Sequence, residues 1–145
     1  MILLDSNVYI RSFNDPAFGR EFRRFHQANL PQLVLSVVVL TELLVGADSP
    51  DRERALRRTI VEPFAARRRV HVPLRQIWET AARVDQRIRA LGGVQAGLAQ
   101  RSFFNDILIA ASARDLGATI VTQNLADFGL IQRVLDIRFE APWPG

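Results

Sequence analysis

Short apolar runs alternate along this chain with longer segments in which apolar residues recur every three or four positions. Runs that are apolar throughout are typical of strands buried on both faces, and the recurring spacing indicates helices. The expected strands are residues 2–4, 33–36, 70–73, 118–122 and 137–140. The expected helices are residues 6–13, 17–29, 37–45, 48–69, 75–90 and 103–116. This alternation predicts an α/β fold, a three-layer α/β/α sandwich with a central parallel sheet.

Proline and glycine set the expected boundaries between these elements. Pro63 is expected to break or bend the arginine-rich helix, and Gly117 to end the last long helix. The stretch "QNLADFG", residues 123–129, is expected to be a tight segment between two strands. A loose connection is indicated by three closely spaced glycines, Gly92, Gly93 and Gly97.

The composition is that of an ordinary globular protein. Of the 145 residues, 48% are hydrophobic and 23% are charged, so we expect a single domain spanning residues 1–145. The chain has no cysteine, which excludes disulfides, thiolate metal sites and cysteine nucleophiles and permits a reducing compartment. The longest apolar run, residues 33–40, is far shorter than the roughly 20 residues of a membrane helix. We therefore expect a soluble, cytoplasmic protein that does not enter a membrane.

The positive charge is carried by arginine alone. The net charge is +4, and all 19 basic residues are arginines. A P-loop nucleotidase is excluded, because its phosphate-binding motif requires a lysine. Arginine suits phosphate and stacks on bases, so a polyanionic partner is expected, although a GC-rich genome would also favour arginine. The runs "RERALRR" and "FAARRRV" are candidates for phosphate contacts, and the competing interpretation of each is a solvated helix face.

Asp5 follows the first expected strand, where "LLDSN" changes from apolar to polar. Ligands of open parallel sheets collect at the carboxyl ends of the strands, so a carboxylate in this position is a candidate for chemistry. The competing interpretation is a helix N-cap, because aspartate and serine both accept hydrogen bonds from free backbone N–H groups. Both interpretations remain open for Asp5.

Glu42 and Asp106 lie in apolar surroundings. Glu42 is the only charged residue between Leu30 and Gly46, and burying an unpaired carboxylate is costly. Asp106 lies in "FFNDILIAASA", where the residues one turn away are apolar or small. The competing interpretations are an exposed strip for Glu42 and a first-turn carboxylate favoured by the helix dipole for Asp106.

Convergence of Asp5, Glu42 and Asp106 would require a counter-charge. Two like charges about 4 Å apart repel by roughly 4 kcal/mol at an effective dielectric of 20, so a cation or a bound proton must compensate. Hard oxygen ligands select Mg²⁺ or Mn²⁺, which polarise a phosphodiester and activate a water molecule. Asn124 and Asp127 follow the fourth expected strand and are further candidates, with turn formation as the competing interpretation.

Three segments resemble, in this order, the successive signatures of PIN-domain nucleases: "LLDSNVYI", "LSVVVLTELLVG" and "NDILIAASARDLGATIVTQNLADF". The size and order resemble the VapC-like toxins of prokaryotic toxin-antitoxin pairs, and the resemblance extends from Ile2 to about Pro142. It implies a parallel sheet with an acidic pocket at its carboxyl end and a magnesium-dependent endoribonuclease that cleaves single-stranded or loop RNA. It also implies a homodimer and neutralisation by a cognate antitoxin protein.

The resemblance also assigns residues. Asp5, Glu42 and Asp106 match the first, second and third acidic ligands of the metal, and Ser6 matches the small hydroxyl residue that orients the first carboxylate. On this hypothesis the three carboxylates hold Mg²⁺, or Mn²⁺ in its place, and metal-activated water attacks the RNA phosphate.

The sequence departs from the family pattern at Asn124, where many relatives carry a fourth aspartate. A carboxylate instead follows three residues later, at Asp127, which we count with the catalytic residues in a supporting role. Asn124 itself is able to bind a water molecule or a ligand oxygen. Two questions stay open at this point: whether one or two ions bind, and whether Asn124 or Asp127 completes the shell.

Other classes of function fit less well. Receiver domains need a lysine near their acidic pocket and paired acids after the first strand, and haloacid-dehalogenase-like phosphatases need a second aspartate there, whereas this chain has "DSN" and no lysine. The remaining alternative is a PIN-like module that binds RNA or a partner without cleaving it. A groove for an antitoxin helix or a dimer partner is expected along three apolar residues among the arginines, Leu56, Ile60 and Phe64.

Overall fold

The computed structural model describes residues 1–91 and 101–143, and the glycine-rich connection expected at 92–97 lies outside these residues. Its centre is a five-stranded sheet with the order β3-β2-β1-β4-β5, in which every paired neighbour is parallel. The strands are β1 (Ile2–Leu4), β2 (Leu33–Ser36), β3 (Val70–His71), β4 (Thr119–Val121) and β5 (Arg138–Glu140). All five lie within one or two residues of their predicted positions, and the predicted parallel sheet is confirmed.

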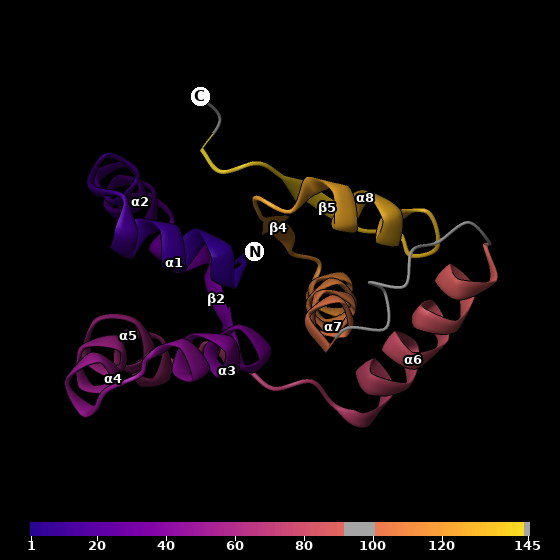
Figure 1. Ribbon diagram of the computed structural model, residues 1–145, viewed down its shortest axis with the longest axis horizontal. Coiled ribbons are helices and arrows are strands. Elements are labelled where there is room, and N and C mark those ends of the chain that lie inside the picture. The colour runs from indigo at the N-terminus through magenta and orange to yellow at the C-terminus, as the bar shows by residue number, and fades with distance from the viewer. Residues whose placement is uncertain (92–100, 144–145) are drawn as a thin grey trace.

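Helices cover both faces of this sheet, which confirms the predicted three layers. Figure 1 shows the helices of the first half, indigo to magenta, in the left part of the molecule and those of the second half, pink to yellow, in the right part. The first group is α1 (Ser6–Asn14), α2 (Pro16–Asn29), α3 (Val37–Gly46), α4 (Pro50–Leu56) and α5 (Glu62–Ala66). The second group is α6 (Arg75–Ala90), α7 (Arg101–Leu116) and α8 (Leu125–Gln132).

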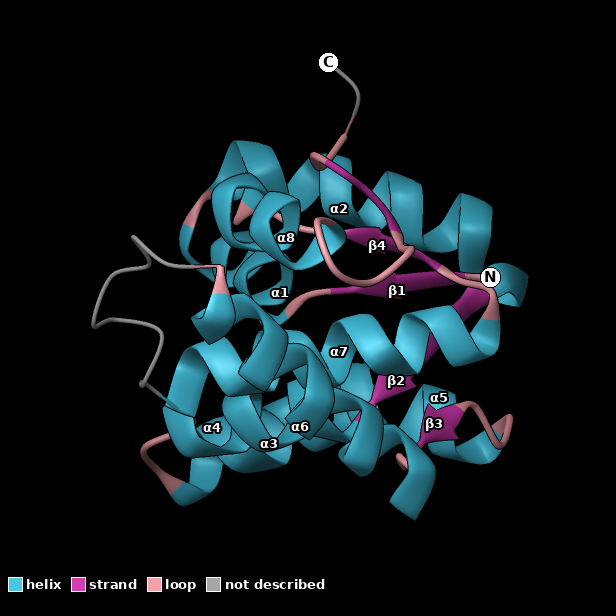
Figure 2. Cartoon of the chain, turned by 90° about the vertical axis from the view of Figure 1, so that its right-hand side faces the viewer, coloured by secondary structure: helices cyan, strands magenta, loops and turns pink. Residues whose placement is uncertain are grey.

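The strand order creates one topological switch point. Figure 2, seen from the side of the second group, shows β4, β1, β2 and β3 in succession down the sheet. From β1 the chain moves outward through β2 to β3, and it then returns to the other side of β1 to form β4 and β5. The crevice at the carboxyl ends of β1 and β4 is therefore the place where an open α/β sheet binds its ligands.

Burial explains why the strands and the central helix are apolar on all sides. Leu3, Leu33 and Ile120 are completely buried in neighbouring strands. Helix α7 carries Ile107 and Ile109, both also completely buried, because it packs between the sheet, α6 and α8. Residues 106–113 of this helix are all buried, so the carboxylate of Asp106 among them is unusual.

The arginine-rich stretch differs in detail from its prediction. Helix α4 continues into a π-helical turn, Arg57–Val61, and then into α5, with Pro63 in the first turn of α5. Proline has no N–H to bond the preceding turn, and Pro63 lies where the π-helical turn changes to α5. The three apolar residues expected to line a partner groove are buried in the core, with exposures of 6% for Leu56, 4% for Ile60 and 1% for Phe64. Leu56 borders an open cavity of about 560 Å³ and Ile60 borders another of about 380 Å³. The groove for an antitoxin helix or a dimer partner stays a prediction.

A second difference follows β4. The stretch predicted as a tight segment forms helix α8, with Asn124 at its N-cap position. Phe128 and Ile131 lie three residues apart and are completely buried, so packing against the core favours the helix over a turn. Gly117 ends α7 as predicted, with a φ of 68° that suits glycine. No helix within residues 1–91 and 101–143 is both long and apolar enough to cross a membrane.

Candidate active site

Asp5 lies at the carboxyl end of β1, next to the end of β4. Its Oδ1 accepts a hydrogen bond from the Ser6 backbone N–H at 2.8 Å, and its Oδ2 accepts one from Thr122 Oγ1 at 2.7 Å. The side chain is only 2% exposed. Asp5 is thus the N-cap of α1, and at the same time it is held at the switch point by a residue from the neighbouring strand end.

Asn7 and Thr122 form a network around this carboxylate that sequence reasoning missed. Asn7 Nδ2 donates to Asp5 Oδ2 at 3.2 Å, and Asn7 Oδ1 accepts from the Gln123 backbone N–H at 3.1 Å. Thr122 Oγ1 accepts from the Asn124 backbone N–H at 3.0 Å. These bonds lock the segment after β1 to the segment after β4. The available signal was their position, since each follows a strand within three residues.

Glu42 reaches the same place from α3. Its Oε1 accepts a hydrogen bond from Ser6 Oγ at 3.2 Å, and the side chain of Asn105 is a second donor to it. Ser6 therefore serves two acids, because its backbone N–H binds Asp5 and its hydroxyl binds Glu42. The exposed strip considered for Glu42 does not describe this arrangement, in which the carboxylate is half-buried and faces α1 and α7.

Asp106 projects from α7 and is 8% exposed. It lies beyond the first turn of the helix, which contains no acidic residue, so the first-turn interpretation does not apply. One amide nitrogen, Asn124 Nδ2, donates to Asp106 Oδ2 at 3.0 Å and to Asp127 Oδ2 at 2.8 Å. Asn124 thereby joins Asp127, in the first turn of α8, to Asp106.

The four carboxylates influence one another and form no ion pair with the residues that the structure describes. Burial, and after it the charges of Asp5, Glu42 and Asp127, raises the pKa of Asp106 to about 8. Burial, and next the charge of Asp5, raises the pKa of Glu42 above its ordinary value, and burial raises the pKa of Asp5. None of the ion pairs in the described part of the chain includes any of these four residues. We call Asp5, Glu42, Asp106 and Asp127 the acidic cluster.

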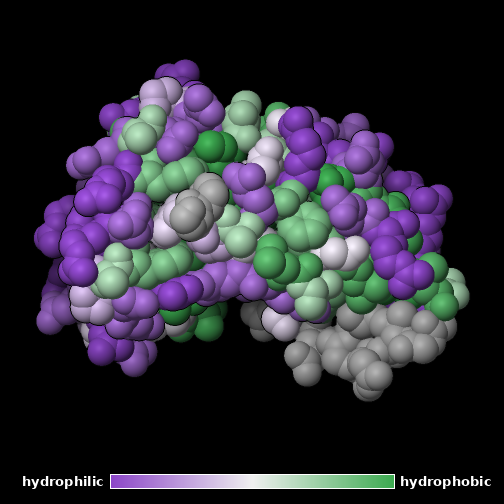
Figure 3. Space-filling model, turned by 90° about the horizontal axis from the view of Figure 1, so that it is seen from above, coloured by the Kyte–Doolittle hydropathy of each residue, from purple (hydrophilic) through white to green (hydrophobic). Residues whose placement is uncertain are grey.

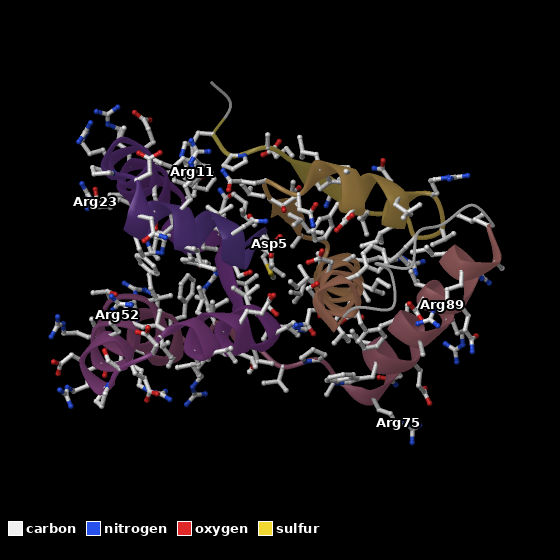
Figure 4. All side chains as sticks on the ribbon, viewed as in Figure 1. Asp5, Arg11, Arg23, Arg52, Arg75 and Arg89 are labelled. Atoms are coloured by element: carbon white, nitrogen blue, oxygen red, sulfur yellow. The ribbon has the colours of Figure 1, made fainter. Side chains whose placement is uncertain are left out.

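Figure 4 shows how this cluster contrasts with the basic residues. Asp5 lies in the middle of the molecule, whereas the labelled arginines, among them Arg52 and Arg75, lie at its periphery. The labelled arginines therefore do not compensate the charge of these carboxylates, and a bound cation or protons on the carboxylates would do so.

The donor set of the acidic cluster suits a hard divalent cation, because it consists of carboxylate and amide oxygens. As the side chains lie, no three His, Cys, Asp or Glu residues of the described ranges are close enough together to hold a metal ion. The amide of Asn124 and the hydroxyl of Ser6 occupy oxygen atoms of the cluster instead. An ion would therefore have fewer than three direct carboxylate ligands, or bind after these side chains rotate.

An open cavity of about 560 Å³ borders the acidic cluster at Glu42. It lies between α1, α3 and α4 and is lined in part by Ile10 and Phe13, which are 43% and 55% exposed. Its volume lies within the range of ligand pockets in proteins. The cluster is thus accessible from one side through a largely apolar opening.

Comparisons with known proteins give a family and a fold. Residues 2–129 match the family model described as PIN domain. No curated protein matches the sequence. Among solved structures, FitAcB from Neisseria gonorrhoeae is 22% identical with a TM-score of 0.74, and the match covers 100% of both chains. DNA-bound VapBC from Salmonella typhimurium is 27% identical with a TM-score of 0.69, covering 97% of this chain and 96% of that one. VapBC-1 from nontypeable Haemophilus influenzae is 24% identical with a TM-score of 0.66, covering 97% and 98% respectively.

Proposed function

The chain belongs to the PIN domain family, and from this premise we propose that it is a magnesium-dependent endoribonuclease and the toxin of a toxin-antitoxin pair. The observation that carries the proposal is the acidic cluster itself. Segments far apart in sequence bring four carboxylates to the switch point of the sheet, and none of the ion pairs found among the described residues includes them. Such an arrangement costs folding stability, and it is explained if the site serves to bind a cation and a phosphate.

Asp5, Glu42 and Asp106 are the residues that would hold the ion, Mg²⁺ or alternatively Mn²⁺, with Asp127 and Asn124 completing its surroundings. When bound, the ion supplies positive charge that polarises the phosphodiester and activates water for hydrolysis. The chain's own residues orient the carboxylates. Thr122 and Asn7 fix the orientation of Asp5, Ser6 fixes Glu42 relative to Asp5, and Asn124 holds Asp127 beside Asp106.

The proposed partners follow from the neighbours in fold. The solved structures similar to this chain include FitAB and VapBC complexes, several of them bound to DNA, and a toxin-antitoxin complex from Klebsiella pneumoniae. By analogy, we expect this chain to bind a cognate antitoxin protein, to form a homodimer, and to act on cytoplasmic RNA as a single domain of residues 1–145. The alternative function is a PIN-like module that binds RNA or a partner without cleavage, which the absence of a fourth aspartate at position 124 favours.

The test is cleavage of a mixed cellular RNA pool by the purified protein in magnesium and in EDTA. The decisive variant is Asp106→Asn, and the matched control is Asp115→Asn, an exposed acid near the end of the same helix. The proposal expects discrete magnesium-dependent fragments with wild type and control and none with Asp106→Asn. Identical fragments from all three proteins would indicate a contaminating nuclease and contradict it. RNA binding without cleavage by a folded wild type in Mg²⁺ and in Mn²⁺ would favour the non-cleaving module.

A further inference from the structure

A second cavity, of about 270 Å³, lies outside the acidic cluster, between α6, the end of α7 and the turn that follows α8. Three arginines line it: Arg83 and Arg87 from successive turns of α6, and Arg114 from α7. Val84 and Leu135, which are 4% and 6% exposed, form part of its apolar lining. We call this hollow the arginine cavity. Figure 3 shows hydrophilic side chains gathered at both ends of the molecule, including the right-hand end, where Figure 1 places α6 and α8.

The arginines of this cavity differ from their neighbours in their pairing. On the same helix, Arg75 pairs with Glu79 at 3.9 Å and Arg89 pairs with Asp85 at 3.0 Å. Neither Arg83 nor Arg87 has an ion-pair partner among residues 1–91 and 101–143, and Arg114 has none within those ranges either. The sequence from 92 to 100 contains no acidic residue that could supply one.

The charge balance of the cavity is therefore strongly positive. Three guanidinium groups face a single lining carboxylate, that of Asp136. Like charges one helical turn apart, as Arg83 and Arg87 are, disfavour the helix unless an anion lies between them. The hydroxyl of Thr80, one turn before Arg83, adds an uncharged hydrogen-bond donor to the same face.

We propose that the arginine cavity binds a backbone phosphate of an RNA strand. Arginine forks match phosphate oxygens in pairs, and three of them line the same hollow. Arg114 follows Asp106 by eight residues on α7, a distance of about 12 Å along the helix axis. The phosphate bound here is consequently a different one from the phosphate at the acidic cluster. The choice of RNA as the source of the phosphate rests on the proposed function.

The test measures RNA binding instead of cleavage. Fluorescence anisotropy of a labelled single-stranded RNA of mixed sequence is recorded in EDTA over a range of salt concentrations. The triple variant Arg83→Gln, Arg87→Gln, Arg114→Gln is compared with a charge-matched control, Arg20→Gln, Arg23→Gln, Arg58→Gln, whose arginines are exposed on other elements. For the cavity variant we expect affinity to fall by on the order of tenfold, and the slope of log K against log salt to fall by about 0.7, the value for one single-strand phosphate contact.

The control should keep the wild-type slope. Equal losses in both variants would show that diffuse charge, and not the cavity, binds RNA, and would overturn the proposal. Unchanged RNA affinity of the cavity variant would overturn the proposal as well. If the triple variant fails to fold, the single variant Arg87→Gln replaces it in the same measurement. Stabilisation by inorganic phosphate without any effect on RNA binding would identify a free-anion site, and loss of antitoxin binding alone would identify a protein interface. Because EDTA is present, a protein that never cleaves RNA still gives a clear result, so failure of the proposed function is distinguishable.

Discussion

The carboxylates of the acidic cluster and those on and near helix α4 differ in their burial and in their partners. On and around α4, Arg52 lies 2.9 Å from Asp48 and Arg57 lies 3.0 Å from Glu53, each pair one helical turn apart and exposed to solvent. In the acidic cluster, four carboxylates come from four segments, are buried or half-buried, and have only neutral hydrogen-bond donors around them.

This difference separates charges that affect the stability of the native state strongly from charges that affect it little. Exposed pairs within a helix contribute about 0.3–0.5 kcal/mol each and can be exchanged without consequence. Buried carboxylates that repel one another destabilise the native state until a proton or a cation compensates them. The acidic cluster is thus the region where burial of like charges lowers the stability of the native state, and the proposed nuclease activity would account for this loss.

The largest expected effect is on cleavage. Asp5→Asn should reduce magnesium-dependent RNA cleavage by on the order of 100-fold or more, because one of the charges that would hold the ion is lost while the amide still caps α1. Asp51→Asn, which removes an exposed acid of α4, should leave the rate unchanged. The initial rate of fragment formation measures both. Equal cleavage rates for Asp5→Asn and Asp51→Asn would contradict a special role of the acidic cluster in cleavage.

The next largest expected effect is a fall in the free energy of unfolding of the metal-free protein as the pH rises. The ordinary pKa of an aspartate is 3.8 and that of native Asp106 is about 8, so between these values the native state holds a proton that the unfolded chain has released. The stability that this bound proton gives the native state is fully present below about pH 4 and is lost as the pH rises through 8. Urea denaturation in EDTA should give a free energy of unfolding at least about 1.4 kcal/mol lower at pH 8.5 than at pH 5. Asp106→Asn should flatten this dependence, and Asp51→Asn should preserve it; a rise in wild-type stability with pH would contradict the account.

Asn124→Asp adds a fifth acid to the acidic cluster and should increase its repulsion. The change replaces an amide that donates to two carboxylates with a group that repels both, so the metal-free protein should lose about 1–3 kcal/mol of stability. Magnesium should then raise its melting temperature by more than it raises that of the wild type. Gln86→Glu, on the exposed side of α6, adds the same charge and is the control. Identical melting temperatures of Asn124→Asp and wild type, with and without magnesium, would rule out the role given to Asn124.

The smallest effect belongs to α4. Glu53→Gln breaks the exposed pair with Arg57 and should change the free energy of unfolding by no more than about 0.5 kcal/mol. Denaturation at two salt concentrations measures this change, which should shrink further in high salt. A loss of several kcal/mol would mean that the exposed pairs, too, are essential to the fold.

The sequence predicted most of the fold because its signals there are local. The limits of α6 at Arg75 and Ala90 match the prediction. Helix α3 begins within one residue of its prediction, and Ser36 caps it by accepting a hydrogen bond from the Val38 backbone N–H at 3.1 Å. Helix α8 was missed because its short polar start resembles a turn, and only its contact with the core decides in favour of a helix.

The candidate site was predictable in part for the same reason. An acid in apolar surroundings, such as Glu42 or Asp106, stands out within a few residues of sequence. Several of the bonds that hold the acids are harder to predict, because they join positions far apart in the sequence: Thr122 to Asp5, Ser6 to Glu42 and Asn124 to Asp106. No periodicity or motif encodes such pairs, and they become visible only when the elements that carry them lie side by side.

Binding of Mn²⁺ to the purified protein at neutral pH, followed by the electron paramagnetic resonance signal of the free ion, tests the central claim most directly. The account predicts that wild type and Asp51→Asn bind the ion, and that Asp5→Asn and Asp106→Asn bind it far more weakly while remaining folded. Binding of equal strength by all four proteins would contradict it, because the acidic cluster would then not be the place where the ion is held.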